Sequence, residues 1–319
     1  MSSNTQTSDK PAQFSAEQTS HQQLLEINGH TFCVEDIGDP TAIPIIFIMG
    51  LACQMTHWPE GLLNGLLDRG YRVIRFDNRD IGLSEKISGG FKVNTRLAYL
   101  EYKLGFNPHA NYTLHDMAND TSTILAALNI KAAHIVGASM GGMIGQLLAA
   151  SHPEKVLSLT TIMSSTNSPR LPMPELGLML KLSKVGKGQN DMASVLKRWQ
   201  YFWSSVQSPA YPTPAEHIKK LIKHNYERCY SPGGTIRQIQ AMLATGSIEA
   251  IIRHITAPTL IIHGTNDPLL KPACGKAIAR NIKSSKLELI KGMGHDLPEQ
   301  LIPQFIQLID DHVQGTKTQ

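Results

Sequence analysis

The chain has 319 residues, which is enough for one large domain or two smaller ones. Hydrophobic residues make up 41% of it and charged residues 18%, proportions that exclude a collagen, a coiled coil or a wholly disordered chain. The 30 basic and 26 acidic residues give a formal net charge of +4 and form no long basic run, so we expect no nucleic-acid partner.

Cysteines and histidines give no sign of disulfide or metal chemistry. The four cysteines form no C-x-x-C pair, and four in a chain of this length do not make a disulfide framework. The thirteen histidines include no H-x-x-x-H or H-E-x-x-H spacing, so we expect no metal ion. The cysteine usage suits a reducing compartment, the cytoplasm.

Residues 1–22 are rich in Ser, Thr and Gln and contain no apolar segment, which is typical of a disordered tail. They lack the basic start and the apolar stretch of a secretory signal peptide. No later stretch reaches the ~18 uninterrupted apolar residues that a membrane span needs. We therefore expect a cytoplasmic protein that does not insert into a membrane.

The first regular elements are two strands, 24–28 and 31–35, joined by the turn dipeptide Asn28-Gly29 as a hairpin. Short apolar runs without polar alternation follow at 44–49, 71–76, 133–137, 156–163, 258–263 and 286–290. Helical stretches separate them at 60–69, 114–128, 140–151, 272–281 and 298–313. Continuous apolar strands that alternate with helices predict an α/β fold, with a mostly parallel central sheet flanked by helices.

One interval, from residue 163 to 257, breaks this alternation. It contains no clear β-run, and helical segments are expected there at 174–182, 192–202, 214–226 and 235–244. A helical insertion after a central strand is typical of a lid over one end of the sheet. We therefore predict a core domain made of residues 23–163 and 248–316, with a helical cap at 164–247 inserted in it.

A nucleophile motif follows the predicted strand 133–137. Gly137-Ala138-Ser139-Met140-Gly141 has the G-x-S-x-G pattern, and a predicted helix begins directly after it. In a nucleophile elbow the Ser occupies a strained strand-to-helix turn, and the glycines let neighbouring chain segments approach closely. The strand before and the helix after the motif make Ser139 the candidate nucleophile.

A serine hydroxyl is a weak nucleophile that needs a histidine base, which in turn needs an orienting carboxylate. His295 lies in the Gly-rich loop after the last predicted strand, and Asp267 follows the strand before it. The chain order Ser, Asp, His at carboxyl ends of strands matches the order expected for this arrangement. We expect His263 to be a core residue and Asp296 to be a loop or capping acid.

The oxyanion of an acyl-transfer reaction needs two backbone donors. The N–H of Met140, next to the nucleophile, is one candidate, and the loop after strand 44–49 should provide the other. In that loop Gly50 permits a tight turn, and the N–H of Leu51 is the predicted second donor.

These motifs resemble those of the α/β-hydrolase superfamily, in particular its aclacinomycin methylesterase-like branch. The resemblance rests on Ile48-Met49-Gly50-Leu51, on the segment 75–84 (RFDNRDIGLS), on 137–142, on 264–268 and on 292–298. It implies a serine carboxylic-ester hydrolase with the triad Ser139, Asp267 and His295 and no cofactor. One departure is Met49, because many members of the superfamily have His before the Gly.

Two further features need an interpretation. We expect the block Asp77-Asn78-Arg79-Asp80 to be architectural, with the Arg fork bracing the oxyanion loop. The cap carries a dense aromatic stretch, 196–203, with Met163, Met173, Met179, Met192 and Met242 around it. Such side chains are commonly core, but a lid must also line the cavity, so some of them should form an apolar pocket.

The leading functional hypothesis is hydrolysis of small hydrophobic carboxylic esters, with a small-molecule ester as the only expected partner. The same triad also serves carbon–carbon bond cleavage of the β-ketolase type, and thioester or lactone hydrolysis. A non-catalytic binding protein on the same fold is the remaining alternative. Nothing in the sequence indicates an oligomeric state.

Overall fold

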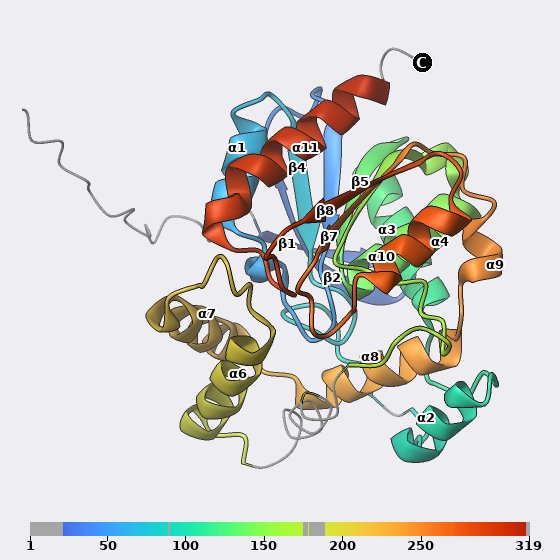
Figure 1. Cartoon of the computed structure of the whole chain (residues 1–319), viewed down its shortest axis with the longest axis vertical. Helices are drawn as coiled ribbons and strands as arrows, with labels where there is room; N and C mark the ends of the chain where they lie inside the picture. The colour runs from blue at the N-terminus through green and yellow to red at the C-terminus, as the bar shows by residue number, and fades with distance from the viewer. Residues whose placement is uncertain (1–21, 89, 175–177, 179–188, 317–319) are drawn as a thin grey trace, which may run out of the picture.

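The computed structural model describes residues 22–88, 90–174, 178 and 189–316 (Figure 1). The predicted disordered tail lies outside the described residues, apart from Gln22. Most of the predicted helix 174–182 also lies outside them.

A single eight-stranded sheet forms the centre of the molecule, in the order β1-β2-β4-β3-β5-β6-β7-β8. Its strands are β1 (Gln22–Ile27), β2 (His30–Ile37), β3 (Pro44–Ile48), β4 (Arg72–Phe76), β5 (Ala133–Ala138), β6 (Val156–Ile162), β7 (Thr259–Gly264) and β8 (Ser285–Ile290). Strand β2 pairs antiparallel with β1 and β4, and every other pairing is parallel. The mostly parallel sheet predicted from the apolar runs is confirmed.

The hairpin β1–β2 is closed by Asn28 and Gly29, both with positive φ (52° and 78°). Two successive left-handed residues are the signature of a type I′ turn, whose twist matches that of the flanking strands. The register pairs Ile27 with His30, as the two-residue turn requires.

Helices cover both faces of the sheet (Figure 1). On one face, α1 (Glu60–Leu67) packs against α11 (Ile302–Gly315); on the other lie α3 (Leu114–Ala127), α4 (Met140–Ser151) and α10 (Ala273–Asn281). Each layer has its own apolar cluster, so the central strands are buried on both sides. All six residues of β5, for example, are buried. This explains why these strands are continuous apolar runs rather than alternating ones.

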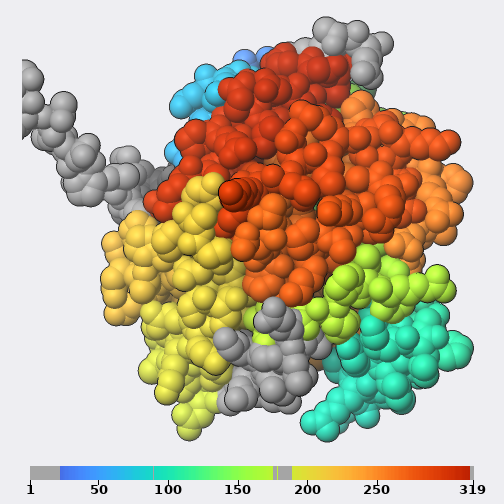
Figure 2. Space-filling model, in the orientation of Figure 1, coloured from blue at the N-terminus to red at the C-terminus, as the bar shows by residue number. Residues whose placement is uncertain are grey.

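Between β6 and β7 the structure has helices α6 (Met192–Val206), α7 (Ala215–Arg228), α8 (Pro232–Thr245) and the short α9 (Glu249–Ile252). Helices α6 and α7 pack together, whereas α8 lies against α2 (Thr95–Lys103), an element that the sequence did not reveal. Figure 2 shows the α6–α7 pair (yellow) seated against the C-terminal part of the chain (orange and red). The division into core and cap at residues 164 and 247 remains a prediction. No helix among the described residues is long and apolar enough to span a membrane.

Candidate active site

Ser139 sits in a strained turn between β5 and α4. Its backbone has φ 53° and ψ −117°, a combination that costs a non-glycine residue roughly 1–3 kcal/mol. A Cβ on Gly137 would collide with the carbonyl of Gly141, and one on Gly141 would collide with the carbonyl of Ile48. Both glycines are therefore needed for the close approach, as the motif requires. Hydrogen bonds from Ser139 N to Ile162 O (2.9 Å) and from Ser164 Oγ to Ser139 O (2.8 Å) hold the turn in place.

His295 reaches Ser139 from the loop after β8. Its Nε2 lies 3.0 Å from Ser139 Oγ, and its own backbone N–H donates to Val206 O at 2.7 Å. The imidazole is largely buried, with 6% of the residue exposed. The end of α6 therefore helps to hold the loop that carries this side chain.

Asp267, in the loop after β7, lies on the far side of the imidazole. Its Oδ2 is 2.7 Å from His295 Nδ1, while Oδ1 accepts hydrogen bonds from the amides of Leu269 (2.9 Å) and Leu270 (2.8 Å). A carboxylate can only accept, so Nδ1 carries the imidazole proton and Nε2 is free to accept from the Ser139 hydroxyl. The structure thus brings together the three side chains that the sequence singled out.

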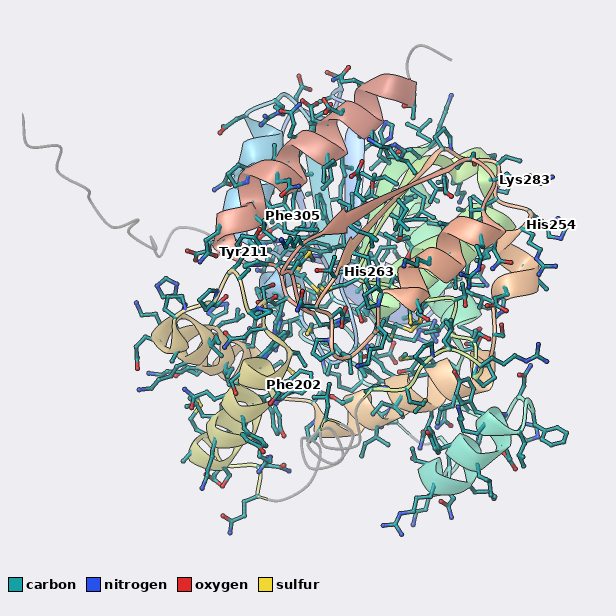
Figure 3. The ribbon with its side chains drawn as sticks, in the orientation of Figure 1. Phe202, Tyr211, His254, His263, Lys283 and Phe305 are labelled. Atoms are coloured by element: carbon teal, nitrogen blue, oxygen red, sulfur yellow. The ribbon has the colours of Figure 1, made fainter. Side chains whose placement is uncertain are left out.

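His263, at the end of β7, supports the same loop (Figure 3). It is fully buried, and its Nε2 donates to Leu270 O at 2.7 Å, so its Nδ1 is unprotonated. Burial lowers the pKa of this imidazole, which keeps it neutral even though Asp267 Oδ2 is 3.6 Å away. The expectation of a core histidine is confirmed.

The two predicted oxyanion donors lie in adjoining segments. Cys53 N donates to Gly50 O at 3.3 Å, which closes a turn over residues 50–53. A Cβ on Gly50 would lie 3.1 Å from Ser139 Cβ and 3.8 Å from Met140 N, so this turn packs directly on the elbow. Met140 is the first residue of α4, so its N–H makes no hydrogen bond within the helix. The donor roles of Leu51 and Met140 remain predictions.

The block that follows β4 is architectural, but its contacts differ from the expected ones. The contact to the oxyanion loop comes from Asn78, whose Nδ2 donates to Met49 O at 2.9 Å. Arg79 instead binds both carboxylate oxygens of Asp120 (2.6 and 2.5 Å) and lies over the ring of Tyr112. A carboxylate partner for the Arg fork was expected, but this one lies on α3, and the brace on the oxyanion loop comes from Asn78.

Two acidic residues of this block bind arginines that sequence reasoning missed. Asp77 Oδ2 lies 2.7 Å from Arg228 Nη1 at the end of α7, and Asp80 accepts two hydrogen bonds from Arg237 on α8 (2.9 and 2.5 Å). Both carboxylates are fully buried. An unpaired buried carboxylate is strongly destabilising, so each of these acids requires a cationic partner once it is buried. The sequence alone does not indicate which arginines provide it.

Asp296, next to His295, also has a structural partner. Its Oδ1 accepts from both the amide (3.0 Å) and the hydroxyl of Ser208. Burial raises the pKa of this carboxyl group, and the hydrogen bonds from Ser208 oppose that effect. The expectation of a loop acid is therefore refined: Asp296 joins the His295 loop to the end of α6.

A cavity lies between helices α6, α7 and α8 and the loop after β3. Its lining includes Ala52, next to Leu51, and the aromatic residues Trp199, Trp203, Tyr226 and Tyr230. Ser139 is not part of that lining.

Phe202, of the same aromatic stretch, is instead 7% exposed and packs in a small apolar cluster with Leu178 and Val206 (Figure 3). No methionine among the described residues lines this cavity, so the members of the expected set that line it are aromatic, Trp199 and Trp203.

His57 lies at one wall of the cavity, 6.0 Å between ring centres from Trp203. Burial lowers the pKa of His57 to about 4, and the nearby His224 and Arg228 add to this effect. Within the described parts of the chain, no group of His, Cys, Asp or Glu side chains could hold a metal ion.

Comparison with known proteins identifies the family. The model of the alpha/beta hydrolase fold family matches residues 43–300, and the chain belongs to this family. The fold class predicted from the sequence is thereby confirmed.

Relatives within the family have several activities in their names. The chain is 26% identical to rhodomycin D methylesterase DauP of Streptomyces sp. (strain C5) over 290 residues, 84% of this chain and 90% of that protein. It is 26% identical to 3-oxoadipate enol-lactonase 1 of Acinetobacter baylyi over 90% of this chain and 94% of that one. A solved meta-cleavage product hydrolase from Pseudomonas fluorescens IP01 matches with a TM-score of 0.71 at 18% identity, covering 92% and 97% of the two chains, which shows a shared fold. The methylesterase match supports the branch that the motifs suggested.

Proposed function

We propose that the protein is a serine hydrolase that cleaves small hydrophobic carboxylic esters through an acyl-enzyme. The observation that carries the proposal is a pair of consecutive hydrogen bonds. One joins Ser139 Oγ to His295 Nε2 (3.0 Å), and the other joins His295 Nδ1 to Asp267 Oδ2 (2.7 Å). Unrelated serine hydrolases use this row of groups for acyl transfer.

In the proposed reaction, Ser139 Oγ attacks the ester carbonyl while His295 Nε2 takes the hydroxyl proton. The Leu51 and Met140 amides stabilise the negative oxygen of the tetrahedral intermediate. His295 then protonates the leaving alcohol, and a water molecule that it activates releases the acid from Ser139. Asp267 holds the imidazole in the required tautomer. The two backbone N–H groups that donate hydrogen bonds to its Oδ1 leave Oδ2 directed at His295.

The substrate class is inferred from the cavity beside the oxyanion loop. Aromatic side chains dominate its wall on the α6–α7 side, and such walls favour apolar or ring-containing groups. We assign this region to the proposed cap, residues 164–247. A cytoplasmic location is part of the proposal and is supported by the unpaired state of all four cysteines.

The test is a comparison of Ser139→Ala with the unchanged protein on short p-nitrophenyl esters. We expect turnover to fall by ~10⁴- to 10⁶-fold, the scale of a triad deletion. Equal turnover in the two proteins contradicts the mechanism. Labelling by a fluorophosphonate probe, present in the unchanged protein and lost in Ser139→Ala, separates an enzyme from a binding protein on the same fold.

Lactone hydrolysis is the second candidate, because the similarity to an enol-lactonase extends over 90% of the chain. A panel of esters, thioesters, lactones and vinylogous diketones, assayed with both proteins, ranks these reactions. Preference for the diketones would favour carbon–carbon bond cleavage.

A further inference from the structure

Gln238 of α8 joins the oxyanion loop to the loop after β4. Its Oε1 accepts a hydrogen bond from Ala52 N–H (3.0 Å), and its Nε2 donates to Arg79 O (3.0 Å). The residue has no exposed surface, so both ends of the amide depend on these partners. Gln238 belongs to the chain segment that connects β6 to β7, and its side chain thus bridges two loops that lie far earlier in the chain.

The turn that Gln238 contacts is conformationally demanding. Ala52 occupies its third position with φ 62°, a left-handed conformation that costs an L-residue ~1–2 kcal/mol and is usually given to Gly. The hydrogen bond from Ala52 N–H to a buried acceptor stabilises this orientation of the Leu51–Ala52 peptide. Without the acceptor, this partly buried N–H would lose its partner and the turn could relax to another form.

The Leu51 N–H depends on the same turn. It shares a planar trans peptide with the carbonyl of Gly50, and that carbonyl is held inside the turn by Cys53 N–H. The Leu51 N–H therefore points away from the turn. A change of the turn that moves the backbone of Gly50 or Leu51 therefore tilts this peptide and redirects the N–H.

Helix α8 holds Gln238 firmly. One turn earlier, a Cβ on Gly234 would collide with the carbonyl of Asp80, so the helix backbone lies directly on the loop. Next to Gln238, Arg237 binds both oxygens of the buried Asp80 carboxylate. The amide of Gln238 is thus fixed relative to the loops that it bridges.

We propose that Gln238 is a positioning residue, whose amide fixes the turn at residues 50–53 so that the Leu51 N–H is aimed at the oxyanion formed on Ser139. The inference rests on the function proposed above. It assigns to α8 a role in transition-state stabilisation that is separate from substrate binding, because the effect passes through backbone geometry.

The test compares Gln238→Leu with a matched control, Gln240→Leu. Gln240 lies on the same helix, is buried to 5% exposure and bonds Val93 O and Thr95 Oγ1 at the start of α2 rather than the oxyanion loop. A third variant, Gln238→Glu, keeps an acceptor for Ala52 N–H but loses the donor to Arg79 O. For each we measure kcat and KM on a p-nitrophenyl ester, the rate of inactivation by a fluorophosphonate, and the melting temperature.

We expect Gln238→Leu to lower kcat and the inactivation rate at least ~10-fold, the scale of a weakened oxyanion donor, with KM changed less than ~3-fold. Gln240→Leu should lower the melting temperature similarly but leave kcat unchanged, and Gln238→Glu should recover part of kcat. The inference is overturned if Gln238→Leu and Gln240→Leu have the same kcat, or if Gln238→Leu changes KM alone. An active Ser139→Ala refutes the proposed function instead, so the two failures are distinguishable.

Discussion

Ser208, just after α6, binds Asp296, the residue that follows His295. The amide and hydroxyl of Ser208 both donate to Asp296 Oδ1, and the same hydroxyl oxygen accepts from Gly294 N at 2.8 Å. Ser208 has no exposed surface. Together with the bond from His295 N to Val206 O, these contacts fix the His295 loop from both sides of the histidine.

The first prediction concerns Ser208→Ala. Loss of the hydroxyl removes a donor to a buried carboxylate and an acceptor for Gly294 N–H, so we expect a loss of ~1–3 kcal/mol in the free energy of unfolding. We also expect a lower kcat, because the His295 loop is then less restrained. Urea unfolding and ester assays measure the two effects.

Ser204→Ala is the control for this variant. Ser204 lies in α6, four residues before Ser208, and its hydroxyl donates to the local carbonyl of Tyr201 at an exposed position. Its loss should change neither quantity. Equal stability and kcat in the two variants would show that the Ser208 contacts do not restrain the loop.

A second prediction concerns the ion pair between Arg228 and Asp77. Asp77 is fully buried, and Arg228→Met leaves its carboxylate without a counter-charge, although the amides of Met55 and Leu83 still donate to it. Removing one partner of a buried pair costs ~3–5 kcal/mol, so we expect a large fall in the melting temperature. The double variant Asp77→Asn/Arg228→Met should recover part of it.

The exposed pair on the same helix provides the comparison. Lys223 lies 3.7 Å from Glu227, with both side chains more than half exposed. Lys223→Met should therefore change the free energy of unfolding by less than ~0.5 kcal/mol. An Arg228→Met protein as stable as Lys223→Met would contradict a stabilising role of the buried ion pair.

The third prediction concerns stability against pH. Burial lowers the pKa of His57 to about 4, whereas a histidine in an unfolded chain has a pKa of about 6.5. The folded state therefore binds this proton more weakly, so the contribution of His57 is complete above pH ~6.5 and is lost as the pH falls toward 4. The slope of the free energy of unfolding should reach at most ~1.4 kcal/mol per pH unit for this group.

The measurement is urea unfolding at a series of pH values between 4 and 7. His57→Gln should reduce the slope, while the buried His263 and the half-buried His312, whose pKa values burial also lowers, keep part of it. An unaltered slope in His57→Gln would show that His57 is solvated in the folded state.

The site and the sheet could be predicted from sequence because their signals are local. Ser139 lies in a five-residue motif between a strand and a helix, and Asp267 and His295 each follow an apolar run. Parallel topology then brings the ends of these strands to one edge. The same logic found every strand of the sheet to within a residue or two.

The contacts between the helices that lie between β6 and β7 and the earlier loops could not be predicted in this way. Gln238 and Ala52 are 186 residues apart, and nothing in a polar residue on a helix indicates which distant amide it will bind. Helix α2 was missed for a different reason. Its apolar residues Leu97 and Leu100 are exposed and Ala98 is its one buried residue, so it packs little against the core whose apolar pattern guided the prediction. Its clearest local signal is the side chain of Asn94, which caps the first turn.

The last prediction concerns Gly50→Ala. The added Cβ would lie 3.1 Å from Ser139 Cβ and 3.2 Å from Ala138 O, closer than ordinary van der Waals contact and against a backbone with little freedom to move. The turn at residues 50–53 must then retreat by a few tenths of an ångström. If that turn supplies an oxyanion donor, kcat should fall ~10-fold with little change in KM, because misplaced donors weaken the transition state more than the bound substrate.

Gly61→Ala is the matched control. Gly61 lies in α1, and its added Cβ would meet only the side chain of Ile302, at 3.4 Å. Ala is also the better helix former, so this variant should be as stable as the unchanged protein and fully active. An unchanged kcat in Gly50→Ala would place the second oxyanion donor outside this turn. A loss of kcat in Gly50→Ala, but not in Gly61→Ala, would instead tie catalysis to the contact between the turn and the elbow.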